Sequence, residues 1–311
     1  MLWELSRRKW IAGTLASIAG GCVASRAIPA LADDEVVLEE AKSEFNEIVV
    51  AERGTVRTMY FVVDGTYYIE SRLDRAHAKS LDLDYSRTMM AGFMLNPRPR
   101  SLLIIGFGGG QISNYLFERI KGLEVDGVDI DPEVVRLAHK YFDVPNDPTY
   151  RTHVADGRLF VEDSPKDKRW DMIVLDAFRG VYVPFHLKTT EFYAHLRSRL
   201  TDRGVVVANL HKYTEMYPHD RETFADAFPG GYAFRSESGR QCTYVATAFG
   251  DSVGAYAMRA NAAEADPLFD FDIKGLAARW YLERDWKAAE VLTDDFPQGA
   301  TPAGAERHNQ R

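Results

Sequence analysis

A run of glycines directly after an apolar segment is the part of this chain best suited to holding a small-molecule ligand. Residues 102–105 are leucine and isoleucine, which predicts a short buried strand, and a helix is predicted over 111–121. Three glycines stand between them at alternate positions: Gly106, Gly108 and Gly110. Glycines at such a place let the backbone approach a ligand closely and direct the helix N-terminus towards it. The sequence therefore predicts a nucleotide or nucleoside site at the end of this strand.

The spacing of these glycines separates two kinds of site. A dinucleotide-binding loop has the pattern G-x-G-x-x-G, and its third glycine would stand where this chain has Gln111. The pattern G-x-G-x-G is instead typical of proteins that bind a nucleoside sulfonium, in which no pyrophosphate has to be accommodated. We therefore expect a donor such as S-adenosylmethionine.

Two aspartates follow the next predicted strand, 124–128. Asp129 comes about 20 residues after the glycine loop, where a carboxylate at a strand end can accept hydrogen bonds from both ribose hydroxyls. Asp131 precedes Pro132 and Glu133, which is typical of a residue that caps a helix. We assign the ligand to Asp129 and the cap to Asp131, and a shift of one residue would exchange these roles.

Two further strands also end in an acidic residue. Asp156, followed by Gly157, comes after the strand predicted at 151–154 and is placed to accept the amino group of an adenine, to cap the next helix, or to do both. Asp176 ends the strand predicted at 171–175. Because parallel strands end at the same edge of a sheet, we expect the Asp176 carboxylate to face the reacting end of the ligand.

The elements that must position these residues alternate between buried strands and helices after Pro99. Such an alternation predicts an α/β fold with a seven-stranded, mostly parallel Rossmann-like sheet. The last two strands, near 232–235 and 242–249, have only a turn between them and are predicted to be antiparallel. Upstream, Asp64-Gly65 separates two β-branched and aromatic runs, which predicts a hairpin in a small antiparallel β-domain. A helix over 83–95 links the two parts and ends before Pro97.

The first 32 residues differ from the rest. Arg7 and Arg8 precede an uncharged stretch over 10–25 and the small-residue site Ala30-Leu31-Ala32, which together resemble a twin-arginine export signal. The sequence therefore predicts an exported, periplasmic protein. Three alternatives remain: lipid modification at Cys22, an uncleaved segment that associates with the membrane, and a cytoplasmic protein.

The chain is thus divided into four parts. These are a signal segment (1–32), the β-domain with its linking helix (33–97), the nucleoside-binding domain (98–265), and a C-terminal part (266–311) with a helix near 276–286 and a disordered tail from Pro297.

Composition excludes several classes of protein. No apolar run approaches the roughly 20 residues that cross a bilayer, so a multi-pass membrane protein is excluded. The net charge is −8, and without residues 1–32 it becomes −11, with 34 basic against 45 acidic residues. This balance argues against a nucleic-acid partner. Removing the leader leaves Cys242 alone, so no internal disulfide is expected, and no Cys/His cluster has the spacing of a metal site.

Together these features resemble the polyamine aminopropyltransferase (spermidine synthase) family, in particular its divergent bacterial branch, on the fold of S-adenosylmethionine-dependent methyltransferases. The resemblance runs from about Val49 to Phe249 and includes Val183-Pro184-Phe185-His186-Leu187 and Gly204-Val205-Val206-Val207. It implies a homodimer in which decarboxylated S-adenosylmethionine gives its aminopropyl group to a small-molecule amine. Methylthioadenosine is the implied product.

The chain departs from the family pattern at three places. The resemblance implies an aspartate in the glycine loop that holds the donor's amine, and Gly109 stands there. It implies a second aspartate that acts on the attacking amine, and Arg179 stands there. The family's Tyr-His pair corresponds to Tyr85-Ser86. We therefore expect an intact nucleoside half of the site and a rebuilt amine half.

The candidate catalytic residues are Asp176 and Tyr85, and the candidates for substrate contact are Arg179 and His186, with His211-Lys212-Tyr213 on the same edge. Arg179 would suit a donor that keeps its carboxylate, so both S-adenosylmethionine and its decarboxylated form stay open. Two other functions remain: a methyltransferase on the same fold, and a catalytically silent protein that binds a nucleoside or a polyamine.

Overall fold

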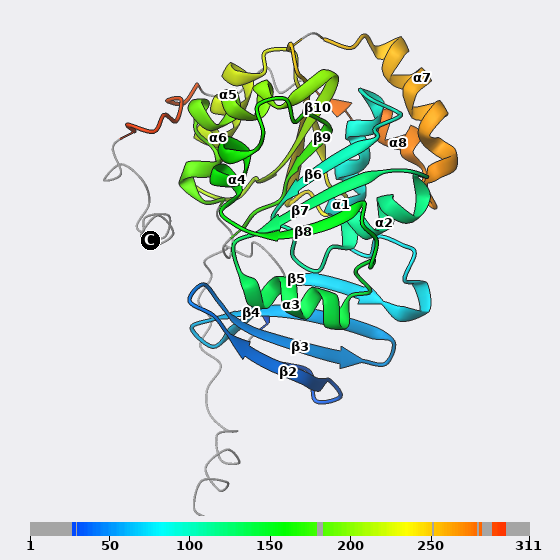
Figure 1. The fold of residues 1–311 in the computed structure, drawn as a ribbon, viewed down its shortest axis with the longest axis vertical. Helices are drawn as coiled ribbons and strands as arrows, with labels where there is room; N and C mark the ends of the chain where they lie inside the picture. Colours follow the sequence, from blue (N-terminus) through cyan, green and yellow to red (C-terminus); the bar gives the residue numbers. More distant parts are fainter. Residues whose placement is uncertain are drawn as a thin grey trace, which may run out of the picture.

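The chain forms two sheets, one large and one small, with helices around the large one (Figure 1). The computed structural model describes residues 27–28, 30–178, 183–250, 252–278, 280–281 and 288–296, to which the structural statements below refer. Residues 1–26 and 29 of the predicted signal segment, including Cys22, lie outside the described residues, as do Arg179 and the tail from Pro297.

The large sheet confirms the predicted α/β class. Its strands, in spatial order, are β8 (Tyr150–Val154), β7 (Glu124–Asp129), β6 (Ser101–Ile105), β9 (Trp170–Leu175), β10 (Leu200–His211), β12 (Gln241–Thr247), β11 (Tyr232–Arg235) and the two-residue β13 (Trp280–Tyr281). The first five are parallel, and β12, β11 and β13 are antiparallel to their neighbours. The glycine loop therefore follows a central strand, β6, at the point where the chain order along the sheet reverses, which is where open α/β sheets bind ligands.

Helices cover both faces of this sheet, as continuous apolar strands require. One face packs against α1 (Asp84–Met89), the short 3-10 helix η2 (Met90–Met94), α2 (Gln111–Arg119), α7 (Ala255–Ala265) and α8 (Ile273–Ala277). The other face packs against α4 (Gly157–Asp163), α5 (Thr190–Ser198) and α6 (Tyr217–Ala227). Alternation along β10 sends Val205 and Val207 to the first face, and Val206 and Ala208 to the second.

The small sheet is antiparallel throughout, in the order β1 (Ala27–Ile28), β5 (Thr66–Asp74), β4 (Val56–Val63), β3 (Glu47–Arg53) and β2 (Val36–Lys42). The predicted hairpin is present, because Asp64 and Gly65 join β4 to β5 with φ angles of 49° and 74°. Its buried residues Ile48, Val50 and Met59 pack on Val134 and Leu137 of α3 (Pro132–Tyr141). This packing holds β5 against the large domain.

Two sequence-based expectations about elements need correction. The helix predicted near 276–286 begins earlier, because the Asp272 side chain caps it by accepting from Gly275 N, and it ends at Ala277. Trp280 and Tyr281 instead extend the sheet by pairing with β11. The linking helix predicted over 83–95 changes to 3-10 geometry after Met89.

None of the described helices is long and apolar enough to cross a membrane.

Candidate active site

A pocket opens at the carboxyl edge of the large sheet, between the glycine loop, strand β5 and the start of α1. Its lining includes Gly106, Gly108, Tyr85, Asp176 and Glu70. Three of the predicted elements of the site, namely the glycine loop, Tyr85 and Asp176, therefore meet at one cavity. Glu70, which comes from the small sheet, was not predicted.

The glycine loop is shaped by positive φ angles and close backbone contacts. Gly106 has φ +87°, and a Cβ on it would lie 2.5 Å from the carbonyl oxygen of Asp176. The ends of β6 and β9 can approach each other only because position 106 has no side chain. A hydrogen bond from Asp176 N to Ile105 O at 2.9 Å joins the two strand ends. Gly106 thereby brings Asp176 to the mouth of the pocket.

Asp131 takes the capping position that the sequence predicts, and Asp129 is the last residue of strand β7. Asp131 is buried and caps α3, where one oxygen accepts from Glu133 N at 2.9 Å and the other accepts from Ser43 Oγ at 2.6 Å. The Asp129 carboxylate turns towards the glycine loop and accepts from Gly108 N at 3.0 Å. Burial raises the pKa of Asp129 to about 6, although the hydrogen bond from the Gly108 backbone amide opposes the shift. The ligand role of Asp129 remains a prediction.

Asp176 is the acidic group with the strongest signs of a chemical role. Its carboxylate accepts a hydrogen bond from Asn209 Nδ2 at 2.8 Å and another from the Tyr85 hydroxyl. Burial nevertheless raises the pKa of Asp176 to about 7. Burial and the negative charge of Asp176 hold the pKa of Tyr85 well above its usual value, so the phenol remains a donor. The pair presents a carboxylate that can take up a proton near neutral pH.

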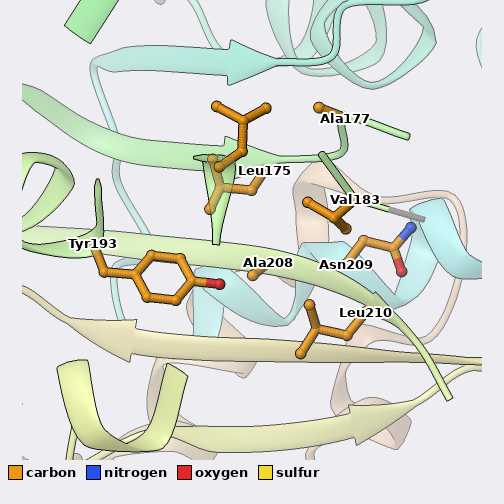
Figure 2. A pocket seen from close by; sticks show the side chains of 8 residues that line it. Leu175, Ala177, Val183, Tyr193, Ala208, Asn209 and Leu210 are labelled. Carbon is orange, nitrogen blue, oxygen red and sulfur yellow. The ribbon is translucent and has the colours of Figure 1, made fainter. Parts of the chain in front are cut away.

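A second, largely apolar cavity lies behind Asn209, between the ends of β9 and β10 and helix α5 (Figure 2). Its lining includes Leu175, Val183, Leu210 and Tyr193. Asn209 lines this cavity and also donates a hydrogen bond to Asp176, which lines the first pocket.

The spermine/spermidine synthase domain model matches residues 84–223. A polyamine aminopropyltransferase of Vibrio vulnificus is 32% identical over 266 residues, which cover 84% of this chain and 89% of that protein. The chain belongs to the polyamine aminopropyltransferase family.

Solved structures support the same fold. A spermidine synthase in complex with the transition-state analogue AdoDATO superposes with a TM-score of 0.61 at 19% identity, covering 79% of this chain and 85% of that one. Human methyltransferase-like protein 13, in complex with SAH, superposes with a TM-score of 0.54 at 20% identity, covering 60% of this chain and 92% of that one. These likenesses establish an aminopropyltransferase and methyltransferase-like fold.

Within this aminopropyltransferase fold, Asp156 and His186 form a hydrogen-bonded pair. Asp156 caps α4 by accepting from Arg158 N at 2.9 Å and Leu159 N at 3.1 Å, and its second oxygen lies 2.8 Å from His186 Nε2. Burial opposes ionisation of Asp156, but the His186 bond lowers its pKa below the usual value. His186 is therefore the partner of Asp156 and does not line the pocket that contains Tyr85. A Cβ on Gly157 would lie 2.3 Å from Ile105 Cγ2, so this glycine lets α4 start close to β6.

Two of the family departures have a structural explanation. Ser86 is buried and donates to Leu83 O at 2.6 Å, so it fixes the first turn of α1. A Cβ on Gly109 would lie 2.7 Å from the Ser71 Cβ, so a neighbouring strand fills the space of the expected aspartate. Arg179 lies outside the described residues.

Other candidate residues take no part in the pocket as described. His211 is 5% exposed, its ring lies 4.8 Å from that of Phe178, and burial lowers its pKa to about 4. The expectation that His211 touches a substrate is thus not supported by its position. Among the described residues, no three His, Cys, Asp or Glu side chains are grouped to hold a metal ion.

Proposed function

We propose that this protein transfers an aminopropyl or related alkyl group from a sulfonium nucleoside to the amine of a small molecule. The observation that carries the proposal is the half-buried Asp176 carboxylate, which accepts hydrogen bonds from Asn209 and Tyr85 beside the glycine loop. Family membership supports aminopropyl transfer in general. The donor and the acceptor are part of the proposal.

The residues divide between holding the donor and activating the acceptor. The Gly108 backbone approaches the donor, and the neighbouring Asp129 carboxylate accepts hydrogen bonds from the ribose hydroxyls. Asp156 and Gly157 lie at the same edge of the sheet, on the adenine side of the proposed donor. Asp176 and Tyr85 face the reacting end.

The chemical step is an in-line displacement. The acceptor nitrogen forms a bond to the carbon next to the sulfonium sulfur, and the carbon–sulfur bond breaks. The sulfur keeps the bonding pair and leaves as a neutral thioether, methylthioadenosine, while the proton lost by the amine passes to Asp176. Free alkyl amines are mostly protonated at neutral pH, with a pKa of about 10, so a carboxylate that orients the amine and takes its proton is needed. An ordinary carboxylate is too weak a base to take this proton readily. The raised pKa of Asp176 reduces the difference in pKa between the amine and the carboxyl group.

Calorimetric titration combined with product analysis tests the proposal. The protein is titrated with S-adenosylmethionine, its decarboxylated form and methylthioadenosine, and then incubated with each donor and a panel of linear diamines and polyamines. We expect binding and the release of methylthioadenosine with an alkylated amine. If none of the three nucleosides binds, the enzymatic proposal fails. Release of S-adenosylhomocysteine with a methylated product would instead identify a methyltransferase.

We also propose that the protein is exported through its N-terminal segment. Cleavage after Ala32 would remove β1, which pairs with β5 only through Ala27 and Ile28, and would leave the other four strands of the small sheet. Because the nucleoside donors are made in the cytoplasm, an exported protein would need to carry its ligand out already bound. Fractionation of cells that express the full chain tests this, and an uncleaved, soluble cytoplasmic product would contradict it.

A further inference from the structure

Glu70 reaches the pocket because strand β5 contains a bulge. Met59 pairs with Ser71 and the next residue, Tyr60, pairs with Ile69, so Glu70 is an extra residue with no partner in β4. A bulge breaks the alternation of side chains and turns one of them to a new direction. A Cβ on Gly108 would lie 2.9 Å from Ser71 Oγ and 3.1 Å from Glu70 Oε1. Two consecutive side chains of β5 therefore face the same loop.

Ser71 holds the loop in place and excludes side chains from it. Its hydroxyl accepts a hydrogen bond from Gly109 N at 2.7 Å. A Cβ on Gly109 would lie 2.7 Å from Ser71 Cβ, which is closer than real Cβ atoms pack, and 3.1 Å from a ring carbon of Phe142, which is a tight contact. A side chain at position 109 would require the loop or strand β5 to shift, and the acid that faces the neighbouring Gly108 is Glu70.

Glu70 has no cationic partner among the described residues. Within the described part of the chain, its carboxylate has no hydrogen-bond or ion-pair partner, and the charges that act on it are those of Asp129 and Asp176. Burial and these negative charges hold the pKa of Glu70 well above its usual value. Arg72 also lines the pocket, but its guanidinium is paired with Asp82 at 3.0 Å. A carboxylate in such a place is costly unless a cation joins it.

We propose that Glu70 binds the terminal ammonium group of the donor's aminopropyl chain and thereby favours a donor without a carboxylate. Decarboxylated S-adenosylmethionine carries two positive centres, the sulfonium and the ammonium, and no negative group on that chain. Ordinary S-adenosylmethionine would bring its carboxylate towards Glu70 and Asp176. This inference rests on the proposed function, since it assigns the donor of the same site.

The test compares the binding of three nucleosides to wild type and Glu70→Gln, without acceptor. The glutamine keeps the length and shape of the side chain but loses the charge. Because hydrogen bonds to charged groups stabilise more than neutral ones, we expect decarboxylated S-adenosylmethionine to bind about 10- to 100-fold more weakly. Methylthioadenosine, which has no aminopropyl chain, should bind within twofold of wild type. The preference for the decarboxylated over the carboxylated donor should shrink accordingly.

Two other variants complete the experiment. Glu40→Gln removes the same charge from an exposed position of the small sheet and should leave all three dissociation constants unchanged. Glu70→Asp keeps the charge on a shorter side chain and should lie between wild type and Glu70→Gln. It also provides a reading if Glu70→Gln folds poorly.

The outcomes separate the inference from the proposed function. If Glu70→Gln weakens the binding of methylthioadenosine as much as the binding of the donor, Glu70 has a structural role and the inference is wrong. The inference is also wrong if Glu70→Gln binds all three nucleosides like wild type and, in steady-state assays with acceptor, raises only the KM of the amine. If wild type binds none of the three nucleosides, the proposed function fails and the inference fails with it.

Discussion

Asn209 donates its side-chain amide to the Asp176 carboxylate at 2.8 Å, across the ends of two neighbouring parallel strands. The register of the sheet creates this contact, because Ala208 of β10 pairs with Leu175 of β9 and the next residue on each strand is Asn209 or Asp176. Asn209 Oδ1 is buried and has no hydrogen-bond partner within the described residues. Asp176 is thus the one hydrogen-bond partner of the Asn209 side chain among the described residues. The hydrogen bond from Asn209 favours the ionised form of Asp176, whereas burial favours the protonated form.

Replacing Asp176 by asparagine separates catalysis from donor binding. Asp176→Asn keeps the shape of the side chain and cannot take a proton, so we expect kcat to fall by about 10²- to 10⁴-fold. The dissociation constant of methylthioadenosine should change less than threefold. Single-turnover kinetics and calorimetry measure the two effects. Asp167→Asn, at an exposed position, is the control, and an unchanged kcat in Asp176→Asn would indicate a binding protein or another base.

The activity of wild type should depend on pH through Asp176. Because the base must be ionised and its pKa is about 7, kcat/KM should rise with pH and level off above that value. The hydrogen bonds from Asn209 and Tyr85 lower this pKa, so Asn209→Ala and Tyr85→Phe should each move the rising limb to higher pH. Asn261→Ala removes an amide that donates to Met94 O in another part of the fold and should not move the limb. A wild-type profile that is flat between pH 6 and 8 would contradict the role of Asp176.

Ionisation of Asp176 should lower the stability of the folded protein, although it raises the activity. The pKa of Asp176 rises on folding from 3.8 to about 7, so between these pH values the folded protein keeps a proton that the unfolded chain releases. Stability is then lost as pH rises through this window, and the loss persists above pH 7. Asp176→Asn removes this loss, so its melting temperature relative to wild type should increase from pH 5 to pH 8. A difference in melting temperature that stays constant over this range would mean that the carboxyl group is not buried as described.

Much of the fold could be predicted because its signals are local. The apolar run before Gly106 and the Asp131-Pro132 start of α3 each specify one element from a few adjacent residues. The two helices that were not predicted lack such a signal. Helix α6 is mostly polar, and α7 is rich in alanine with little contrast between its faces, so their positions depend on tertiary packing.

The site was harder to predict than the fold, because its contacts join distant parts of the chain. Strand alternation predicts opposite directions for Glu70 and Ser71, and only the bulge brings both to the glycine loop. The contact of His186 with Asp156 joins residues 30 positions apart, which no local spacing indicates. The one sequence signal for Glu70 is an acidic residue within an aromatic and β-branched strand.

The contact between Ser71 and position 109 can be measured as a coupling free energy. Gly109→Ala places a Cβ 2.7 Å from Ser71 Cβ in a closely packed loop, and overpacking of this kind destabilises by about 1–3 kcal/mol. Ser71→Gly removes the atom in the way but also loses the bond from Gly109 N, so it should destabilise on its own by about 1 kcal/mol. In the double variant the close contact with Ser71 is gone and only the one with Phe142 stays, so its loss of stability should be smaller than the sum of the two single losses by about 1 kcal/mol. Denaturant unfolding of the four proteins gives the coupling, and strictly additive losses would show that the strand and the loop are not packed together at this point.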